Sequence, residues 1–234
     1  MTMMTGGQAA VEALKTEKVN HVFGLIGSAT MEIFDALYDA PEISFIGIHD
    51  ERTGTHMADG YARASGRTGV VLAGQNGPGA TNLVTGLAQA MAAFSPVVSI
   101  AGALSTAHLY RDAFQEVDQE ALFKPITKKT WTAPSADRIP EMFREAFRVA
   151  NAPRKGPVQL NLPRDVLSAQ ADYAPLQSVD EYRPCAAPAG EASAIARAAA
   201  RLCSAKRPVI IAGGGIKNTE GHAAALALAE ALNA

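Results

Sequence analysis

The sequence has little cysteine, no strong charge of either sign and no long apolar run. Its two cysteines, Cys185 and Cys203, cannot build a disulfide framework and lack the spacing of metal ligands, which suggests a reducing compartment. A formal net charge of -2 excludes a general basic field for nucleic acid. No apolar run could span a bilayer, and the N-terminus lacks a basic segment followed by an apolar core. We therefore expect a cytoplasmic protein with no nucleic-acid partner and no membrane partner.

Apolar runs that alternate with segments of helical spacing are the main feature that is present. A chain of 234 residues, 48% of them hydrophobic, has room for one complete domain and part of another. The alternation predicts an α/β fold with a doubly wound parallel sheet. The expected strands are 21–26, 43–48, 70–73, 96–100, 126–131 and 157–162, and the expected helices are 5–19, 31–37, 52–65, 80–93, 119–123 and 137–150.

The composition changes after the last of these strands. Residues 168–190 are rich in proline, alanine, serine and acidic side chains, which is typical of an interdomain linker. We therefore expect a first domain over 1–167 and the start of a second, Rossmann-like domain over 191–234, with a strand at 208–212 and a helix at 219–232. One strand with two helices cannot bury an α/β core, so we expect this second domain to be incomplete.

Two of the expected strands end in polar or glycine-rich sequence. Glu51 follows the apolar run 43–48, which we expect to be buried on both faces, and ligands gather at the carboxyl ends of parallel strands. Strand 70–73 is followed by GQNGPG, a turn that allows close approach of backbone or ligand. The alternatives are an acidic first helical turn at Glu51 and a plain helix start, with Asn76 as cap and Pro78 near the first helical position.

Four sequence motifs occur in this order along the chain: HDERTGTHMADGYARASG, NGPGATN, DAFQEVDQ and GPVQLNLPRDV. Together they resemble the N-terminal pyrimidine-binding domain of thiamine-diphosphate enzymes, specifically the acetolactate-synthase-like group. The resemblance implies the amino-terminal part of a carbon–carbon ligase or lyase that acts on 2-oxo acids such as pyruvate. It implies that Glu51 is catalytic, because the matching glutamate hydrogen-bonds a pyrimidine nitrogen of the cofactor and favours its imino tautomer.

The resemblance also implies a set of binding residues. For some of them the sequence also allows a role without function: residues 114–118 could be a solvated acidic loop, and Lys128, beside Lys129, could be plain surface charge. The implied cofactor contacts are Ile26, Gly27, Ser28, Glu51, Gly77, Pro78, Asn82 and Gln115, and the implied substrate channel is lined by Phe114, Gln115 and Lys128.

The five histidines do not share metal spacing, so we expect no metal site built by this chain. The family's Gly-Asp-Gly…Asn motif, which holds Mg²⁺ and the diphosphate, is absent, so the Mg²⁺ ligands are expected in a further domain. We therefore expect these 234 residues alone to be inactive. Family sites lie between subunits, which implies a homodimer or tetramer, and the small residues Ala58, Gly60, Ala62 and Ala64 suit close helix packing.

Three alternatives stay open. The sequence at 26–29 and Gln75-Asn76 depart from the synthase pattern and resemble sulfoacetaldehyde acetyltransferases. The run 210–215 suggests a nucleotide-binding oxidoreductase, although it does not complete the dinucleotide fingerprint; in synthases this region begins a domain that can hold FAD. The chain could also be a non-catalytic pyrimidine-domain subunit of a split enzyme.

Overall fold

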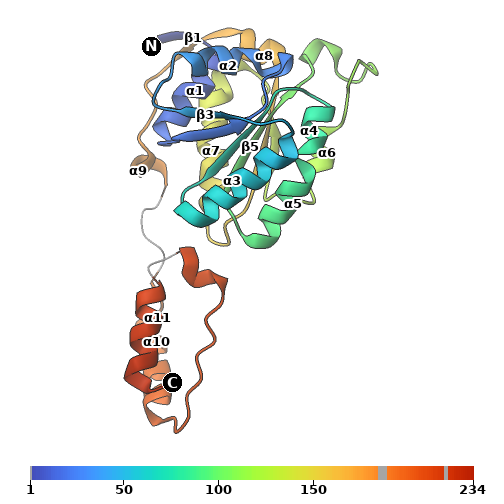
Figure 1. The fold of residues 1–234 in the computed structure, drawn as a ribbon. Helices are drawn as coiled ribbons and strands as arrows, with labels where there is room; N and C mark the ends of the chain where they lie inside the picture. Colours follow the sequence, from blue (N-terminus) through green and yellow to red (C-terminus); the bar gives the residue numbers. More distant parts are fainter. Residues whose placement is uncertain (1, 184–188, 219–220) are drawn as a thin grey trace. The chain divides into compact units, whose positions relative to one another are not determined.

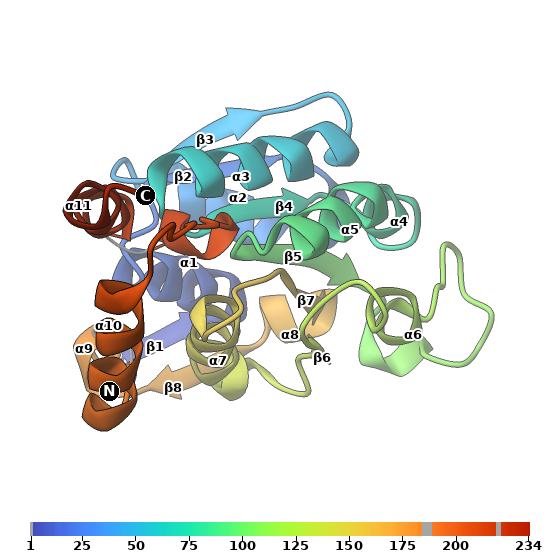
Figure 2. The same ribbon diagram turned by 90° about the horizontal axis from the view of Figure 1, so that it is seen from below.

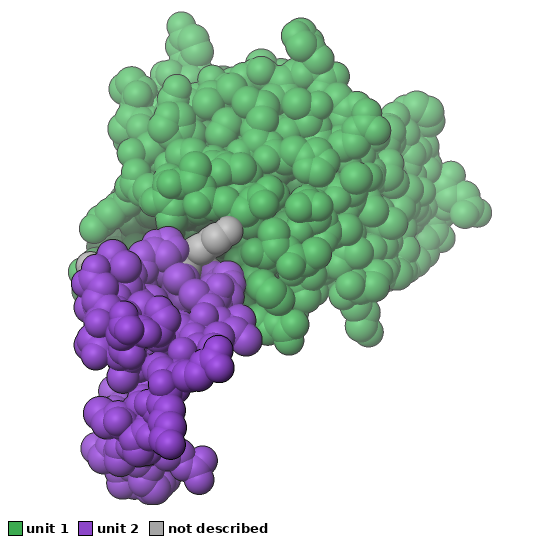
Figure 3. All heavy atoms as spheres, turned by 60° about the horizontal axis from the view of Figure 1, so that its bottom comes forward, with its two compact units in different colours: residues 1–183 green, residues 184–234 purple. Residues whose placement is uncertain are grey.

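The structure is a computed structural model that describes residues 2–183, 189–218 and 221–234 (Figure 1). The chain forms two compact units, residues 1–183 and 184–234, which Figure 3 shows in different colours. Among the described residues, none of the helices combines the length and the apolar character needed to cross a membrane.

Unit 1 is built on a parallel sheet of six strands in the order β3-β2-β4-β5-β7-β6. Every residue of the central strands β4, β5 and β7 is buried, which explains their nearly continuous apolar sequences. The strands are β2 (His21–Gly24), β3 (Ser44–Gly47), β4 (Gly69–Ala73), β5 (Val97–Ala103), β6 (Thr130–Thr132) and β7 (Val158–Pro163).

Helices cover both faces of the sheet, so the predicted doubly wound α/β class is confirmed (Figures 1 and 2). Alternate strand residues serve the two cores: Val70 and Leu72 pack with α1, α2 and α7, whereas Val71 and Ala73 pack with α3, α5 and α6. The helices are α1 (Gly6–Thr16), α2 (Met31–Tyr38), α3 (Glu51–Ser65), α4 (Pro78–Asn82), α5 (Val84–Ala93), α6 (Gln119–Phe123), α7 (Ile139–Asn151), α8 (Arg164–Ser168) and α9 (Val179–Tyr182).

The prediction that strand 43–48 is buried on both faces is wrong. β3 is an edge strand, paired with β2 alone, and its four residues are exposed or half-buried. The buried residues of this run, Ile43 and Ile48, lie just outside the strand. An edge position leaves the faces of β3 only partly covered, and the run of β-branched residues did not reveal that.

Several element boundaries also differ from the prediction. Helix 5–19 begins as expected after Thr5, which forms a capping box with Gln8, but it ends at Thr16. Helix 80–93 is divided into α4 and α5 at Leu83. Strand 126–131 is reduced to β6, and Asp137 lies in a 3₁₀ turn before α7 instead of capping that helix.

Residues 168–183, assigned from sequence to the linker 168–190, are part of unit 1. β8 (Gln170–Tyr173) pairs antiparallel with β1 (Thr2–Thr5). Tyr173 is buried, and its hydroxyl donates to the Ala136 carbonyl at 2.7 Å. A short second sheet, without a long apolar run, therefore extends the first unit beyond residue 167.

Unit 2 contains α10 (Ala192–Ser204), a 3₁₀ turn (Gly214–Asn218) and α11 (Gly221–Leu232). The predicted strand 208–212 is wrong, because the described part of this unit offers no second strand to pair with it. Val209 and Ile211 are accordingly 81% and 93% exposed. Thr219 and Glu220, where the second predicted helix begins, lie outside the described residues.

Candidate functional site

Glu51 is the first residue of α3 and follows the carboxyl end of the edge strand β3. Asp50 caps the helix by accepting a hydrogen bond from the Arg52 amide at 2.8 Å. Glu51 is only 4% exposed, and its Oε2 accepts a hydrogen bond from Asn82 Nδ2 at 3.0 Å. The structure therefore brings together two of the predicted site residues, which are 31 positions apart in the chain.

Close backbone packing fixes α3 on the sheet. A Cβ atom on Gly69 of β4 would lie 2.2 Å from the Ala58 carbonyl oxygen, and one on Gly54 would lie 2.3 Å from Ile48 Cδ1. Both glycines thus allow the helix to approach more closely than a side chain would permit. These contacts place α3, and with it Glu51, against the sheet.

The turn after β4 lies against the Glu51 carboxylate. Gly77 has φ +56°, and Pro78 follows it as the first residue of α4. A Cβ atom on Gly79 would lie 3.1 Å from Glu51 Oε1. Among the described residues Oε1 accepts no hydrogen bond, and it is not one of the fully buried unpaired atoms. Gly79 therefore keeps open the space beside the one carboxylate oxygen that Asn82 leaves free.

The turns after β2 and β4 are in direct backbone contact. A Cβ on Gly27 would lie 2.3 Å from the Gly74 carbonyl oxygen, and one on Gly74 would lie 2.2 Å from the Leu25 carbonyl oxygen. The Ala29 amide also donates to the Gly74 carbonyl at 3.1 Å. No side chain fits between the two strand ends, which are therefore held at a fixed separation.

A chain of hydrogen bonds joins these turns to the loop after β5. Ser28 Oγ donates to Gln75 Oε1 at 2.9 Å, and Gln75 Nε2 donates to Gln115 Oε1 at 2.8 Å. Asn76 does not cap α4, because its side chain donates instead to the Gln115 carbonyl at 3.1 Å. Three segments far apart in sequence thus form one polar wall at the carboxyl edge of the sheet.

Three other predicted site residues, Ile26, Phe114 and Lys128, are not part of this hydrogen-bonded wall. Ile26 and Phe114 are 65% and 83% exposed at this edge. The structure does not bring Lys128 to the site. Its amide donates to the Pro157 carbonyl at 2.8 Å, just before β7 begins, which places Lys128 at the amino edge of the sheet. Its ammonium group donates to the carbonyls of Val149 and Ala152 at the end of α7, and burial lowers its pKa.

A cavity of about 380 Å³ opens beside this polar wall. Sequence reasoning missed two of its charged or titratable residues, His108 and Arg164. Arg164 follows β7 just as Glu51 follows β3, so its position at a strand end was a usable signal, whereas His108 lies in a segment with no period. The lining residues are Ser28, Ala29, Gln75, Asn76, Ala103, Leu104, Ser105, His108 and Arg164.

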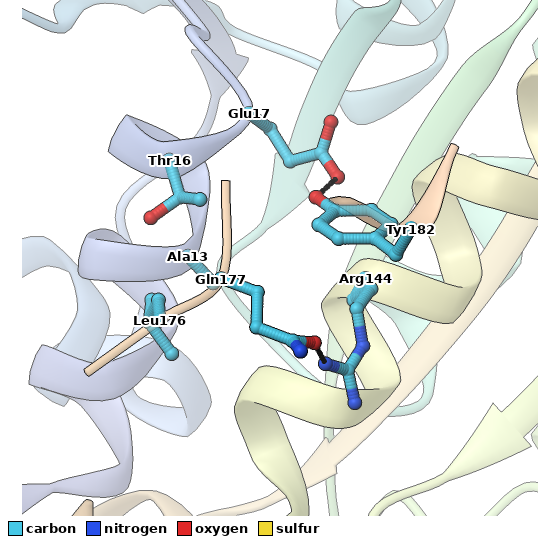
Figure 4. Close-up of a pocket in the computed structure, with 7 residues that line it drawn as sticks. All are labelled: Ala13, Thr16, Glu17, Arg144, Leu176, Gln177 and Tyr182. Atoms are coloured by element: carbon cyan, nitrogen blue, oxygen red, sulfur yellow. Dashed lines mark hydrogen bonds between the residues drawn. The ribbon is translucent and has the colours of Figure 1, made fainter. Parts of the chain in front are cut away.

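A second pocket, of about 20 Å³, lies between α1, α7 and residues 176–182 (Figure 4). Its polar side chains pair with one another: Tyr182 donates to Glu17, and Arg144 donates to Gln177 (Figure 4). Arg183 adds an ion pair to Glu17 at 2.9 Å. The pocket holds no more than about one water molecule, so these residues act as a clamp that fastens segment 176–183 to the rest of unit 1.

Within the described parts of the chain, no three histidine, cysteine, aspartate or glutamate side chains gather as metal ligands would. The polar side chains at the site and its cavity are instead amides, the hydroxyls of Ser28 and Ser105, the His108 imidazole, the buried Glu51 carboxylate and the Arg164 guanidinium.

Comparisons with known proteins agree with this geometry. Residues 4–122 match the family described as thiamine pyrophosphate enzyme, N-terminal TPP binding domain. The probable acetolactate synthase large subunit of Methanococcus aeolicus is 42% identical over 235 residues, which cover 98% of this chain and 39% of that protein. The acetolactate synthase isozyme 3 large subunit of Escherichia coli (strain K12) is 37% identical over 237 residues, and the match covers 100% of this chain and 41% of that protein.

The chain thus spans about two fifths of the length of these curated relatives. The matched residues contain Glu51, the turn after β4 and the Gln115 loop. The resemblance seen in the sequence is confirmed, and the chain belongs to the thiamine pyrophosphate enzyme family through its N-terminal cofactor-binding domain.

Proposed function

We propose that the protein provides the cofactor-activating part of a thiamine-diphosphate-dependent carbon–carbon ligase or lyase of the acetolactate synthase type, acting on a 2-oxo acid such as pyruvate. The observation that carries this proposal is the buried Glu51 carboxylate, oriented by Asn82 and free at Oε1. The names of the relatives favour acetolactate synthase and do not favour a sulfoacetaldehyde acetyltransferase.

The residues around Glu51 fit a flat, nitrogen-containing ring. Asn82 occupies Oε2, so a ring nitrogen that carries a proton would find Oε1 as its acceptor. Gly79 presents no side chain beside that oxygen, and the Gly77-Pro78 turn gives a wall of backbone and ring carbons. The cofactor contacts that we propose are therefore Glu51, Gly77, Pro78 and Asn82, with the polar wall of Ser28, Gln75 and Gln115 beyond them.

Thiamine diphosphate, when bound, supplies a thiazolium carbon that adds to the carbonyl group of a 2-oxo acid. Glu51 would hold and release a proton at the facing ring nitrogen through Oε1, which is general acid–base catalysis. The Asn82 amide keeps the carboxylate in one orientation during this exchange. The low exposure of Glu51, 4%, limits the access of bulk water to this carboxylate.

The cavity beside the polar wall suits the substrate. Arg164 lines this cavity and forms an ion pair with Glu32, 3.6 Å from its Nε to Glu32 Oε1, which leaves its terminal guanidinium N–H groups as donors for the carboxylate of a 2-oxo acid. We place Phe114, with Gln115, at its entrance. Mg²⁺ and the cofactor's diphosphate are proposed to bind to groups other than those described, and the active protein is proposed to be a homo-oligomer, as the family resemblance implies.

The test is Glu51→Gln in the intact enzyme, assayed for thiamine-diphosphate-dependent turnover of pyruvate. The change is nearly isosteric, so the fold should persist while turnover falls by about 10²- to 10⁴-fold. Glu141→Gln is the matched control, because Glu141 is an exposed carboxylate paired with Arg138. Turnover of Glu51→Gln within a few-fold of wild type would show that this carboxylate does not activate the cofactor.

A further inference from the structure

The loop between β5 and α6 is folded around one carboxylate. Glu116 Oε1 accepts a hydrogen bond from the Tyr110 amide at 2.6 Å, and its Oε2 accepts one from the Ala113 amide at 3.0 Å. The Glu116 amide donates back to the Ala113 carbonyl at 2.9 Å. Figure 2 shows this segment, in light green, reaching out beside α6. The three bonds close residues 110–116 into a compact turn.

This turn has unfavourable backbone conformations. Tyr110, Asp112 and Gln115 have φ of +61°, +49° and +62°, in the left-handed region that residues with a Cβ atom rarely adopt. Tyr110 and Phe114 are 96% and 83% exposed, so no hydrophobic core compensates. Hydrogen bonds from the loop amides, Tyr110 first, lower the pKa of Glu116, as expected if the ionised carboxylate holds the turn together.

The turn is joined to the cofactor site through the neighbouring residue, Gln115. Its side-chain oxygen accepts from Gln75, and its backbone carbonyl accepts from Asn76. A Cβ atom on Gly77 would lie 2.5 Å from the same carbonyl. Gln115 is therefore seated directly on the turn that contacts Glu51, and a shift of the loop would remove both hydrogen bonds.

We propose that Glu116 is a positioning residue: its carboxylate holds the strained loop in the one conformation that places Gln115 against residues 75–77 of the cofactor site. The Glu116 carboxylate itself accepts from the loop amides, and none of its hydrogen bonds within the described residues reaches the Glu51 site. The predicted effect of Glu116 on cofactor dependence rests on the proposed function, whereas its predicted effect on the loop conformation does not.

Hydrogen–deuterium exchange of the intact enzyme tests the structural consequence. Glu116→Ala should speed exchange in peptides covering 109–117 by about tenfold or more, because two amides lose a charged acceptor. Glu116→Gln keeps one acceptor oxygen and should lie between wild type and Glu116→Ala. Peptides covering 74–79 should also exchange faster. Glu120→Gln is the matched control, since its carboxylate accepts from Thr132 and not from the loop.

Kinetics test the catalytic consequence. In Glu116→Ala the thiamine diphosphate concentration that gives half-maximal turnover should rise several-fold, with a smaller change in turnover at saturation. If exchange in Glu116→Ala is unchanged at 109–117 or at 74–79, the proposal is wrong whatever the activity. The proposal is also wrong if exchange is faster in Glu116→Ala but its dependence on thiamine diphosphate equals that of wild type. A wild-type enzyme with no cofactor-dependent turnover would contradict the proposed function instead, and exchange at 74–79 would still decide whether Glu116 positions the turn.

Discussion

Gly79 shows how one absent side chain defines the site. A methyl group there would lie 3.1 Å from Glu51 Oε1 and 3.2 Å from Gln75 Cβ, closer than ordinary contacts, so the carboxylate or the turn must shift by a few tenths of an ångström. We expect Gly79→Ala to lower turnover by about tenfold, since small misplacements of a catalytic group are costly. Thermal unfolding should change little, because alanine favours the helix.

The control for this change is Gly213→Ala, where an added Cβ atom would meet nothing within 4 Å. That variant should keep wild-type turnover. Wild-type turnover in Gly79→Ala as well would mean that the space in front of Oε1 is not used.

The sequence predicted the residues at strand ends better than the contacts between them. Glu51, Gly77 and Pro78 follow short apolar runs, and a parallel sheet brings such ends together. The bond from Gln75 to Gln115 joins residues 40 positions apart, and no local pattern indicates it. Lys128 was assigned to the channel from the resemblance alone, and the strand that follows it puts it at the opposite edge.

At the scale of elements, the clamp on segment 176–183 has a pH-dependent member. Burial raises the pKa of Glu17 above its ordinary value of 4.5, although Tyr182 and Arg183 oppose the shift. A raised folded-state pKa gives stability that is fully present below the unfolded value and is lost as pH rises through the folded value. The Glu17 contribution should therefore decline as pH rises above about 4.5.

Glu17→Gln removes this titration and keeps an acceptor for the Tyr182 hydroxyl. The difference in Tm, variant minus wild type, should become more positive between pH 4.5 and pH 7. Glu42→Gln is the control with the opposite sign, because hydrogen bonds donated by its own backbone amide and by Lys15 lower the pKa of exposed Glu42. A pH-independent difference for Glu17→Gln would contradict the assigned shift.

Elements with strong local signals were predicted well, and those that depend on partners were not. Helix α3, predicted over 52–65, is flanked by the polar N-cap Asp50 and by the C-cap Gly66, where φ is +72°. β3 has the apolar residues of a central strand but lies at the sheet edge. Residues 208–212 have equally good strand residues and form none, because strand formation depends on a neighbour that local sequence does not encode.

At the scale of the whole molecule, the small residues of α3 divide into two groups. Ala58 and Ala62 are 0% and 3% exposed and pack on their own sheet, whereas a Cβ atom on Gly60 would meet nothing within 4 Å. Ala64 is exposed as well, and we propose that the exposed face of α3 at Gly60 and Ala64 contacts a second copy of the chain. Gly60→Arg should then weaken self-association by about tenfold or more, measured by light scattering over a dilution series.

Gly60→Ala serves as the control, because it adds only a methyl group and should stabilise the helix by about 1 kcal/mol. A wild-type enzyme that is active and strictly monomeric would exclude this interface. If the Gly60→Arg and Gly60→Ala variants self-associate equally, the interface between the copies does not include Gly60.

The contact between Gly27 and Gly74 has a consequence for inheritance. Both positions require the one residue without a side chain, since either Cβ would lie less than 2.5 Å from a backbone oxygen. In the genetic code every change in the first or second base of a glycine codon replaces glycine, and only third-base changes are silent. Every such change at either codon would therefore put a side chain into the contact that unites the two strand ends.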